Sequence, residues 1–426
     1  MNAEERSRLL FEVHQAGNCS HPVRLRGEMV NLATGEVSDN VLRVACKDRR
    51  RIVCPSCSYL YKADAWILVA SGLLGGKGTP ESVKTHPRLF VTLTAPSFGS
   101  VHTITPSGGC VSRMRSGSPS PCPHGRSLIC RKRHEGSDPM LGRPLCARCF
   151  DFEGAVLWNA HVSRLWNNTV QLIRRSLADV GGVVQSKLST VAQLNYLKVA
   201  EVQRRGLVHV HSVVRVDGPE SIDVDPPSWV TTETLAKVIR ESVADARALR
   251  LDGATVRWGS VLDIRDLALT SDDATKVASY VAKYSTKTTD GSKELARRFH
   301  SRRQIVGLLD DRHYRGLALA AWDLAERPAF AALHLRDHAH AFGFTGQLIT
   351  KSRQYSTTFA ALRSTRAQYM AGQRESDPVE GTFHFEGRGY DDPRATQLAE
   401  VLFTIHQELR QEALAARLSS NEVPEP

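Results

Sequence analysis

The sequence predicts an α+β protein in which helices flank a central antiparallel sheet. Residues 196–203 and 206–215 are rich in apolar and β-branched side chains and are joined by a short Arg-Arg-Gly turn, which predicts a β-hairpin. Helices interleaved with the strands of a sheet that contains such a hairpin are typical of the α+β class. The other predicted elements of this domain are strands at 89–95 and within 255–267, and helices at 151–180 and 232–249.

We expect three regions along the chain. They are a zinc-binding β module at 1–75, the α+β domain at 76–290 with a zinc-binding insertion at about 106–150, and a mostly helical, basic region at 291–426. The insertion is rich in Gly, Ser, Pro, Arg, Cys and His and has no hydrophobic periodicity, so we expect metal ions to hold it in place of an apolar core. In the third region, helical patterns occur at 360–376 and 394–418.

The nine cysteines favour metal binding over disulfides, because the N-terminus has no export signal. Two C-x2-C pairs, CPSC and CARC, have the spacing at which two thiolates bind one tetrahedral zinc ion. The simplest partition places Cys19, Cys46, Cys54 and Cys57 on one zinc ion and Cys122, Cys130, Cys146 and Cys149 on a second. This partition leaves Cys110 without a role.

Other zinc ligand sets remain open at this stage. A histidine could replace a cysteine in either set; the candidates are His21, His124 and His134. The CPSC pair could also share one ion with the CARC pair. Buried free thiols are the interpretation that needs no metal.

The hairpin itself predicts a second kind of metal site. His209 and His211 are two apart on a strand, so their side chains leave the same face. A turn about Arg205 places Glu201 opposite His209 on that face. Two imidazoles and a carboxylate suit Mg2+ or Mn2+ with coordination positions left for substrate. The alternative is a half-buried polar pair without metal.

A helix is predicted to follow the last strand of the domain. Within it, Tyr280 and Tyr284 are four apart and share one face, while Lys283 and Lys287 lie on a neighbouring stripe that suits a phosphate. A tyrosine hydroxyl ionises near pH 10, so it becomes a nucleophile only where neighbouring charge lowers that cost. The alternative is a pair of packing aromatics.

Composition points to a soluble protein with a polyanionic partner. The 426 residues carry a net charge of +11 and are 41% hydrophobic, and no apolar run approaches the length of a membrane span. We therefore expect a cytoplasmic protein that binds nucleic acid. The glycine-rich stretch at 72–79 is not a P-loop, because Lys77 is followed by Gly78 and not by Ser or Thr.

The motifs His209-Val-His211 and Tyr280-Val-Ala-Lys-Tyr284, in this order, resemble those of HUH-superfamily rolling-circle replication initiators. The stretches LFVTLTAPSFG, CPSC, CARC and TKSRQYSTT resemble initiators of actinobacterial plasmids and integrative elements, and the similarity spans most of the chain. The resemblance implies an HUH endonuclease palm at 76–290. It also implies an origin-specific single-strand endonuclease and strand transferase with a 5′-phosphotyrosine intermediate.

The resemblance and the basic residues together give the expected partners. We expect contacts to plasmid-origin DNA from Lys283, Lys287, Arg204, Arg205, Lys351 and Arg353. A host polymerase would extend the free 3′-OH, and a host helicase would unwind, because the chain has no P-loop of its own. The alternatives are an HUH transposase or relaxase and a non-catalytic zinc-dependent DNA-binding regulator. The sequence predicts no oligomeric state.

Overall fold

The computed structural model describes residues 2–104, 110, 121–267, 271–286, 293–372 and 379–420. The chain divides into two compact units: Met1–Ala65 with Phe359–Pro426, and Trp66–Thr358. This division differs from the boundaries expected after residues 75 and 290. The reason is long-range strand pairing, because a C-terminal strand joins the N-terminal sheet.

The first unit combines a small antiparallel sheet with helices from both ends of the chain. Its elements are α1 (Ala3–Gln15), β1 (Val23–Asn31), β2 (Val37–Val44), the first part of α2 (Pro55–Leu74), α8 (Phe359–Gly372), β10 (Val379–Arg388) and α9 (Pro393–Ser420). The strand order is β10-β1-β2, and β10 runs from Val23↔Arg388 to Asn31↔Val379 along β1. Leu9 and Val13 of α1 pack against Ala395 and Ala399 of α9. The helices α8 and α9 match the sequence prediction, whereas β10 was not predicted.

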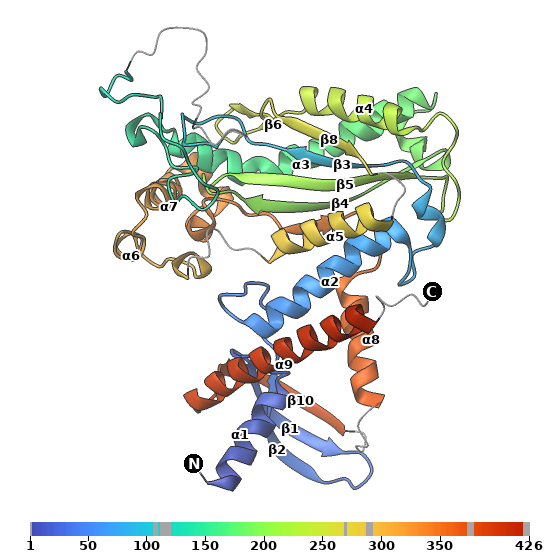
Figure 1. The fold of residues 1–426 in the computed structure, drawn as a ribbon, viewed down its shortest axis with the longest axis vertical. Coiled ribbons are helices and arrows are strands. Elements are labelled where there is room, and N and C mark those ends of the chain that lie inside the picture. Colours follow the sequence, from blue (N-terminus) through green and yellow to red (C-terminus); the bar gives the residue numbers. More distant parts are fainter. Residues whose placement is uncertain are drawn as a thin grey trace. The chain divides into compact units, whose positions relative to one another are not determined.

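The second unit contains the predicted hairpin in the middle of a five-stranded sheet. Its elements are β3 (Arg88–Leu93), α3 (Phe152–Val180), β4 (Gln193–Val202), β5 (Val208–Asp217), α4 (Thr232–Asp245), β6 (Ala248–Leu249), β7 (Thr255–Val256), β8 (Leu262–Asp266), α5 (Ser271–Ser285), α6 (Arg302–Leu308), α7 (Arg312–Leu324) and β9 (Ile349–Lys351). The strand order is β8-β3-β5-β4-β9, with every neighbouring pair antiparallel. Figure 1 shows β8, β3, β5 and β4 side by side in this order. The mixed α+β class is therefore as predicted.

The two faces of this sheet have different surroundings. On β5, Val208, Val210, Val214 and Val216 belong to the main apolar core, together with the buried face of α3. Side chains alternate along a strand, so the odd-numbered residues of β5, which include His209 and His211, lie on the opposite face. No helix of the described residues has the length and apolar character needed to cross a bilayer.

The hairpin turn is fixed by contacts from α3. The amide of Gly206 donates to the carbonyl of Gln203 at 2.8 Å, and Gly206 has φ +76°, which favours glycine. A Cβ at this position would also lie 2.1 Å from Leu317. Buried Asn159 of α3 donates to the carbonyl of Gly206 and accepts from the amide of Val208. These contacts and the φ of Gly206 therefore favour one backbone conformation of the turn.

His313 of α7 holds the same turn from another side. Its Nε2 is 2.9 Å from the carbonyl of Arg205, and its ring packs against Phe150 and Phe152. Burial, with a smaller contribution from Arg143, lowers the pKa of His313 to about 4. The imidazole is therefore neutral at physiological pH and Nε2–H donates to the carbonyl.

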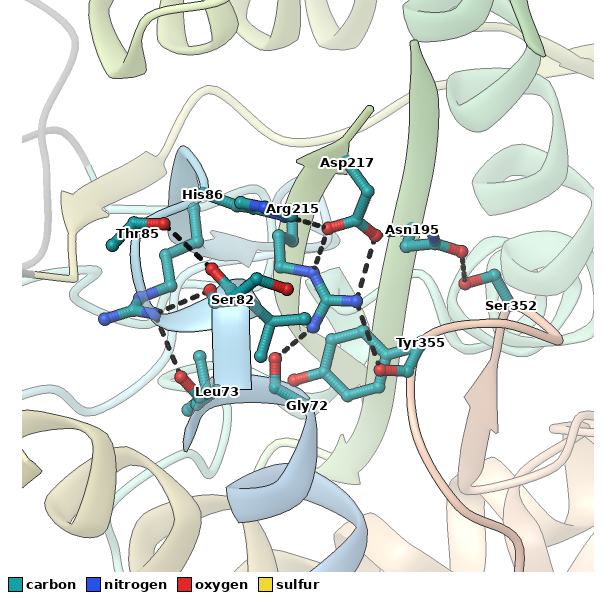
Figure 2. Close-up of polar contacts among 12 residues, drawn as sticks. Gly72, Leu73, Ser82, Thr85, His86, Asn195, Arg215, Asp217, Ser352 and Tyr355 are labelled. Atoms are coloured by element: carbon teal, nitrogen blue, oxygen red, sulfur yellow. Dashed lines mark hydrogen bonds and ion pairs between the residues drawn. The ribbon is translucent and has the colours of Figure 1, made fainter. Parts of the chain in front are cut away.

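A buried polar network holds the other end of the hairpin. Figure 2 shows the Asp217 carboxylate between His86 (2.7 Å), Arg215 (2.6 and 2.9 Å) and Asn195 (2.7 Å). The Arg215 guanidinium also donates to the carbonyls of Gly72 and Tyr355. The network thus ties β4 and β5 to the end of α2 and to the segment after β9.

The charge of Asp217 is maintained by its partners. Burial by itself would raise the pKa of Asp217, but the hydrogen bonds from His86 and Arg215 outweigh burial and lower the pKa. The carboxylate therefore stays ionised at neutral pH. Its contribution to stability is present above the unfolded-state pKa and is lost only when acid protonates the folded carboxylate.

We predict that Asp217→Asn lowers the free energy of unfolding by about 3–5 kcal/mol, because it leaves the buried Arg215 guanidinium without its counter-charge. Asp323→Asn is the matched control, since it removes one partner of the exposed Arg302 pair and should change stability by about 1 kcal/mol or less. Urea denaturation measures both changes. Equal effects of the two variants would contradict the role given to the network.

We also predict that stability falls as pH drops from about 6.5 toward 4, because unfolding lets His313 take up a proton that the folded state rejects. His313→Gln keeps an N–H donor and cannot titrate, so its stability should depend less on pH over this interval. Other titrating groups contribute equally to both proteins. Denaturant unfolding at several pH values gives the two slopes, and identical slopes would contradict the prediction.

Candidate functional site

The structure brings Glu201, His209 and His211 together on the sheet face opposite the α3 core. Glu201 pairs directly with His209 across the β4–β5 ladder, as the sequence predicted. One ligand atom from each of the three residues lies within 4.8 Å of the others. His211 Nε2 lies 3.4 Å from a carboxylate oxygen of Glu201. Two imidazole nitrogens and one carboxylate fit a divalent cation with further coordination positions open.

His209 is prepared to act as a neutral ligand. Its Nδ1 is 2.7 Å from the Gln203 amide, and among the described residues its buried Nε2 has no hydrogen-bond partner. Burial, together with the nearby His211 and Arg205, lowers the pKa of His209 to about 4. A neutral imidazole with a buried nitrogen lacking a partner is what a metal-binding histidine requires.

Thr92 of β3 orients His211, and the sequence analysis did not identify it. Thr92 is the direct neighbour of His211 across the β3–β5 ladder, and its Oγ1 lies 3.2 Å from Nδ1 of His211. This contact leaves Nε2 of His211 directed at Glu201. A second residue that fixes the ring of a ligating histidine is common in metal sites. The sequence signal was only the threonine within the predicted strand at 89–95.

The two tyrosines lie over the histidines. Buried Ala274, Ala278 and Val281 form one face of α5, and Ser279 accepts a hydrogen bond from Trp66. The rings of Tyr280 and Tyr284 are 4.5 Å apart between centroids. The ring of His211 lies 5.3 Å from Tyr280 and 5.7 Å from Tyr284. One histidine therefore contacts both tyrosines on the face that holds the other two ligands.

Tyr280 differs from an aromatic residue of the core in its exposure to solvent and in the charged groups near its hydroxyl. Tyr280 is 39% exposed, so a substrate can reach it. Partial burial, followed by the effects of Tyr284 and Glu201, raises the pKa of Tyr280 above its ordinary value near 10. The phenol is therefore protonated at neutral pH, and ionising it requires added positive charge at the site.

The residues predicted to contact DNA differ in the exposure and the hydrogen bonding of their charged groups. Lys283 is exposed, with its Nζ 6.0 Å from the centroid of the Tyr284 ring, and Arg353 is exposed as well. Lys351 is not available, because its ammonium donates to the carbonyls of Ser352, Arg353 and Ser356 and so uses all three N–H groups. Lys287 lies outside the described residues.

The two arginines of the hairpin turn also make contacts within the protein. Arg204 donates to the carbonyl of Asp138 at 2.9 Å. Arg205 donates to the Gln203 side chain and to the carbonyl of Ala95, and burial lowers its pKa. These contacts give both residues a structural role within the protein, and their predicted contacts with DNA stay a prediction.

The first predicted cysteine set is assembled in the first unit. Ligand atoms of Cys19, Cys46, Cys54 and Cys57 lie within 4.8 Å of one another. The amide of Cys46 donates to Sγ of Cys19, and the sulfurs of Cys19 and Cys54 are 3.7 Å apart. Four converging thiols with amide donors to sulfur could hold one tetrahedral metal ion.

The second predicted cysteine set is divided by the structure. Cys122, Cys146 and Cys149 converge with His124, whose Nδ1 is 3.1 Å from Sγ of Cys149. Burial raises the pKa of Cys122, but amide donors from residues 124 and 126 outweigh it and bring that pKa to about 6. Cys130 belongs to a different group, with His102, Cys110 and His134. The assignment of Cys130 is corrected accordingly, because sequence spacing does not determine which distant loops meet.

Comparison with known proteins identifies the family of the chain. The family model RepSA, described as replication initiator protein of pSAM2, matches residues 5–403. A replication initiator protein of Streptomyces ambofaciens is 34% identical over an alignment of 438 positions, which covers 96% of this chain and 91% of the relative. No solved structure matches. The chain belongs to the RepSA family of replication initiator proteins.

Proposed function

We propose that this replication initiator is an HUH endonuclease that nicks one strand of its origin and starts rolling-circle replication. The observation that carries the proposal is the contact of His211 with both Tyr280 and Tyr284, on the sheet face that also presents Glu201 and His209. A pair of packing aromatics would not need three potential metal ligands beside it. The order of the elements, metal strand before tyrosine helix, also supports the initiator branch of that superfamily.

In the proposed reaction, Glu201, His209 and His211 would hold Mg2+ or Mn2+, and the bound ion would supply positive charge that polarises the scissile phosphate. One tyrosine oxygen attacks phosphorus in line and loses its proton. The bond from phosphorus to the 3′ oxygen breaks, and that oxygen leaves as a 3′-OH after gaining a proton. The product is a 5′-phosphotyrosine, and Lys283 is placed to contact the phosphate.

The covalent link conserves the energy of the phosphodiester, so rejoining of the strand needs no ATP. Two tyrosines one helical turn apart permit attack by one at initiation and by the other at termination. A host polymerase extends the 3′-OH and a host helicase unwinds the duplex. The net charge of +11 supplies attraction to the DNA backbone.

We further propose that two of the cysteine groups each bind structural Zn2+. The Cys19 group is Cys19, Cys46, Cys54 and Cys57, and the Cys122 group is Cys122, His124, Cys146 and Cys149. The first contains four thiols and the second three thiols and one imidazole, and both are donor sets of structural zinc sites. Among its described residues, this part of the insertion contains only one short 3-10 turn, Ala147–Cys149. Zinc bound to the second group would therefore stabilise its fold.

We predict that the protein forms a covalent adduct with single-stranded oligonucleotides tiled across the origin of its own element, in the presence of Mn2+. On a denaturing gel, the adduct should persist in each single variant, Tyr280→Phe and Tyr284→Phe, and disappear in the double variant. Tyr369→Phe changes an exposed tyrosine elsewhere and should behave as wild type. An adduct that survives the double change would remove both tyrosines from the role.

We predict that His209→Ala reduces adduct formation by at least about 100-fold, because one of three metal ligands is lost. Thr92→Val should weaken Mn2+ binding by about 10- to 100-fold, because His211 loses its orienting partner. Calorimetric titration with Mn2+ measures binding, and a gel shift should find DNA affinity nearly unchanged. His300→Ala alters an exposed histidine and serves as control. Normal nicking by His209→Ala would exclude this metal site.

A further inference from the structure

We propose that His102, Cys110, Cys130 and His134 form a third structural zinc site, which supports the turn of the catalytic hairpin. Ligand atoms of these four residues lie within 4.8 Å of one another, and three of the four residues are buried. Cys110, Cys130 and His134 lie in the insertion, and His102 lies just before it. Two thiols and two imidazoles match a tetrahedral zinc donor set.

The contacts within the group have the pattern of a metal centre. Nε2 of His134 lies 3.4 Å from Sγ of Cys130 and 3.2 Å from Nδ1 of His102. The amide of Thr103 points at Sγ of Cys110, at 3.4 Å. A direct hydrogen bond between two imidazoles can satisfy only one pair of nitrogens, whereas a shared cation would satisfy all four donor atoms.

The second nitrogen of His134 has the partner that a zinc-bound histidine commonly has. Its Nδ1 is 2.6 Å from a carboxylate oxygen of Asp138. A carboxylate that accepts from one ring nitrogen fixes the proton there and leaves the other nitrogen to bind the metal. His134 Nε2 is therefore directed at the centre of the group by a residue outside it.

The backbone around the group holds the same geometry. The amide of Cys110 donates to the carbonyl of Lys132, which joins the segments that carry the two cysteines. His102 pairs with the 142–143 segment through the amides of His102 and Gly142. The described part of 121–146 contains neither helix nor strand, so no helical or ladder hydrogen bonds hold these segments, and a bound metal ion would supply cross-links between them.

Two contacts connect this group to the hairpin. The carbonyl of Asp138 accepts from the Arg204 guanidinium, and the Arg143 guanidinium donates to the carbonyl of Arg204. Arg204 is part of the turn that leads from Glu201 to His209. The proposed zinc therefore supports the turn at Arg204, through the insertion. The hydrogen bonds from α3 and α7 reach the carbonyls of Gly206 and Arg205 instead.

Zinc content of the full-length protein, measured by elemental analysis per mole of chain, tests the site. Cys110→Ser and Cys130→Ser should each lose one equivalent, and their double variant should lose one and not two. Combining Cys130→Ser with Cys122→Ser should lose two. The losses in the Cys110 and Cys130 variants do not depend on nicking activity or on how many ions the other groups hold, so they separate this site from the proposed function.

A conservative change covers the case in which the serine variants fail to fold. His134→Cys should keep the wild-type zinc content and, after cobalt substitution, should increase the thiolate-to-cobalt absorption because the site gains a third thiolate. His300→Asn should alter neither quantity. The proposal is overturned if Cys130→Ser keeps full zinc content. It is also overturned if Cys122→Ser alone loses one equivalent and its combination with Cys130→Ser loses no more, which would place both cysteines on one ion.

Discussion

The register of the β4–β5 ladder is the constraint on which the site depends. It pairs Glu201 with His209 and directs His211 to the face that also carries Thr92. A shift of one residue would turn both imidazoles into the apolar core and expose Val208 and Val210 on the site face. The valines that pack against α3 therefore determine which face the metal ligands occupy.

The protein fixes this register at both ends of the hairpin. At the turn, Asn159, His313 and the conformation of Gly206 leave little freedom to the backbone. At the other end, the Arg215–Asp217 pair is fully buried and is anchored to distant segments. Buried charges of this kind are costly unless every partner is present, so they favour one arrangement of the strands over its alternatives. The arrangement places a rigid platform beneath α5.

The local patterns of the sequence predicted what local geometry decides. The alternation of His209 and His211, the spacing of Tyr280 and Tyr284, and the pairing of Glu201 with His209 all follow from strand and helix periods, and the structure contains them. Contacts between distant segments could not be predicted in the same way. Thr92 reaches His211 because β3 neighbours β5 in a register that pairs these two residues, and the sequence does not reveal that register.

The same limit explains the differences in the cysteine groups and the units. Cys130 joins Cys110 instead of the CARC pair because two loops without secondary structure meet, and spacing rules carry no information about that. Paired residues of β1 and β10 lie 348 or more positions apart in the sequence, so β10 was not recognised as part of the N-terminal sheet. Lys351 was predicted to contact DNA because the sequence does not show that its ammonium donates to three backbone carbonyls.

The most direct measurement is to locate the DNA-linked residue by mass spectrometry after reaction with an origin strand, nuclease trimming and trypsin digestion. Lys276, Lys283 and Lys287 place the two tyrosines on separate tryptic peptides, 277–283 and 284–287. We expect a nucleotide on one or both of these peptides and on no other. A nucleotide attached elsewhere, or none on any peptide while nicking proceeds, would contradict the site described for this initiator.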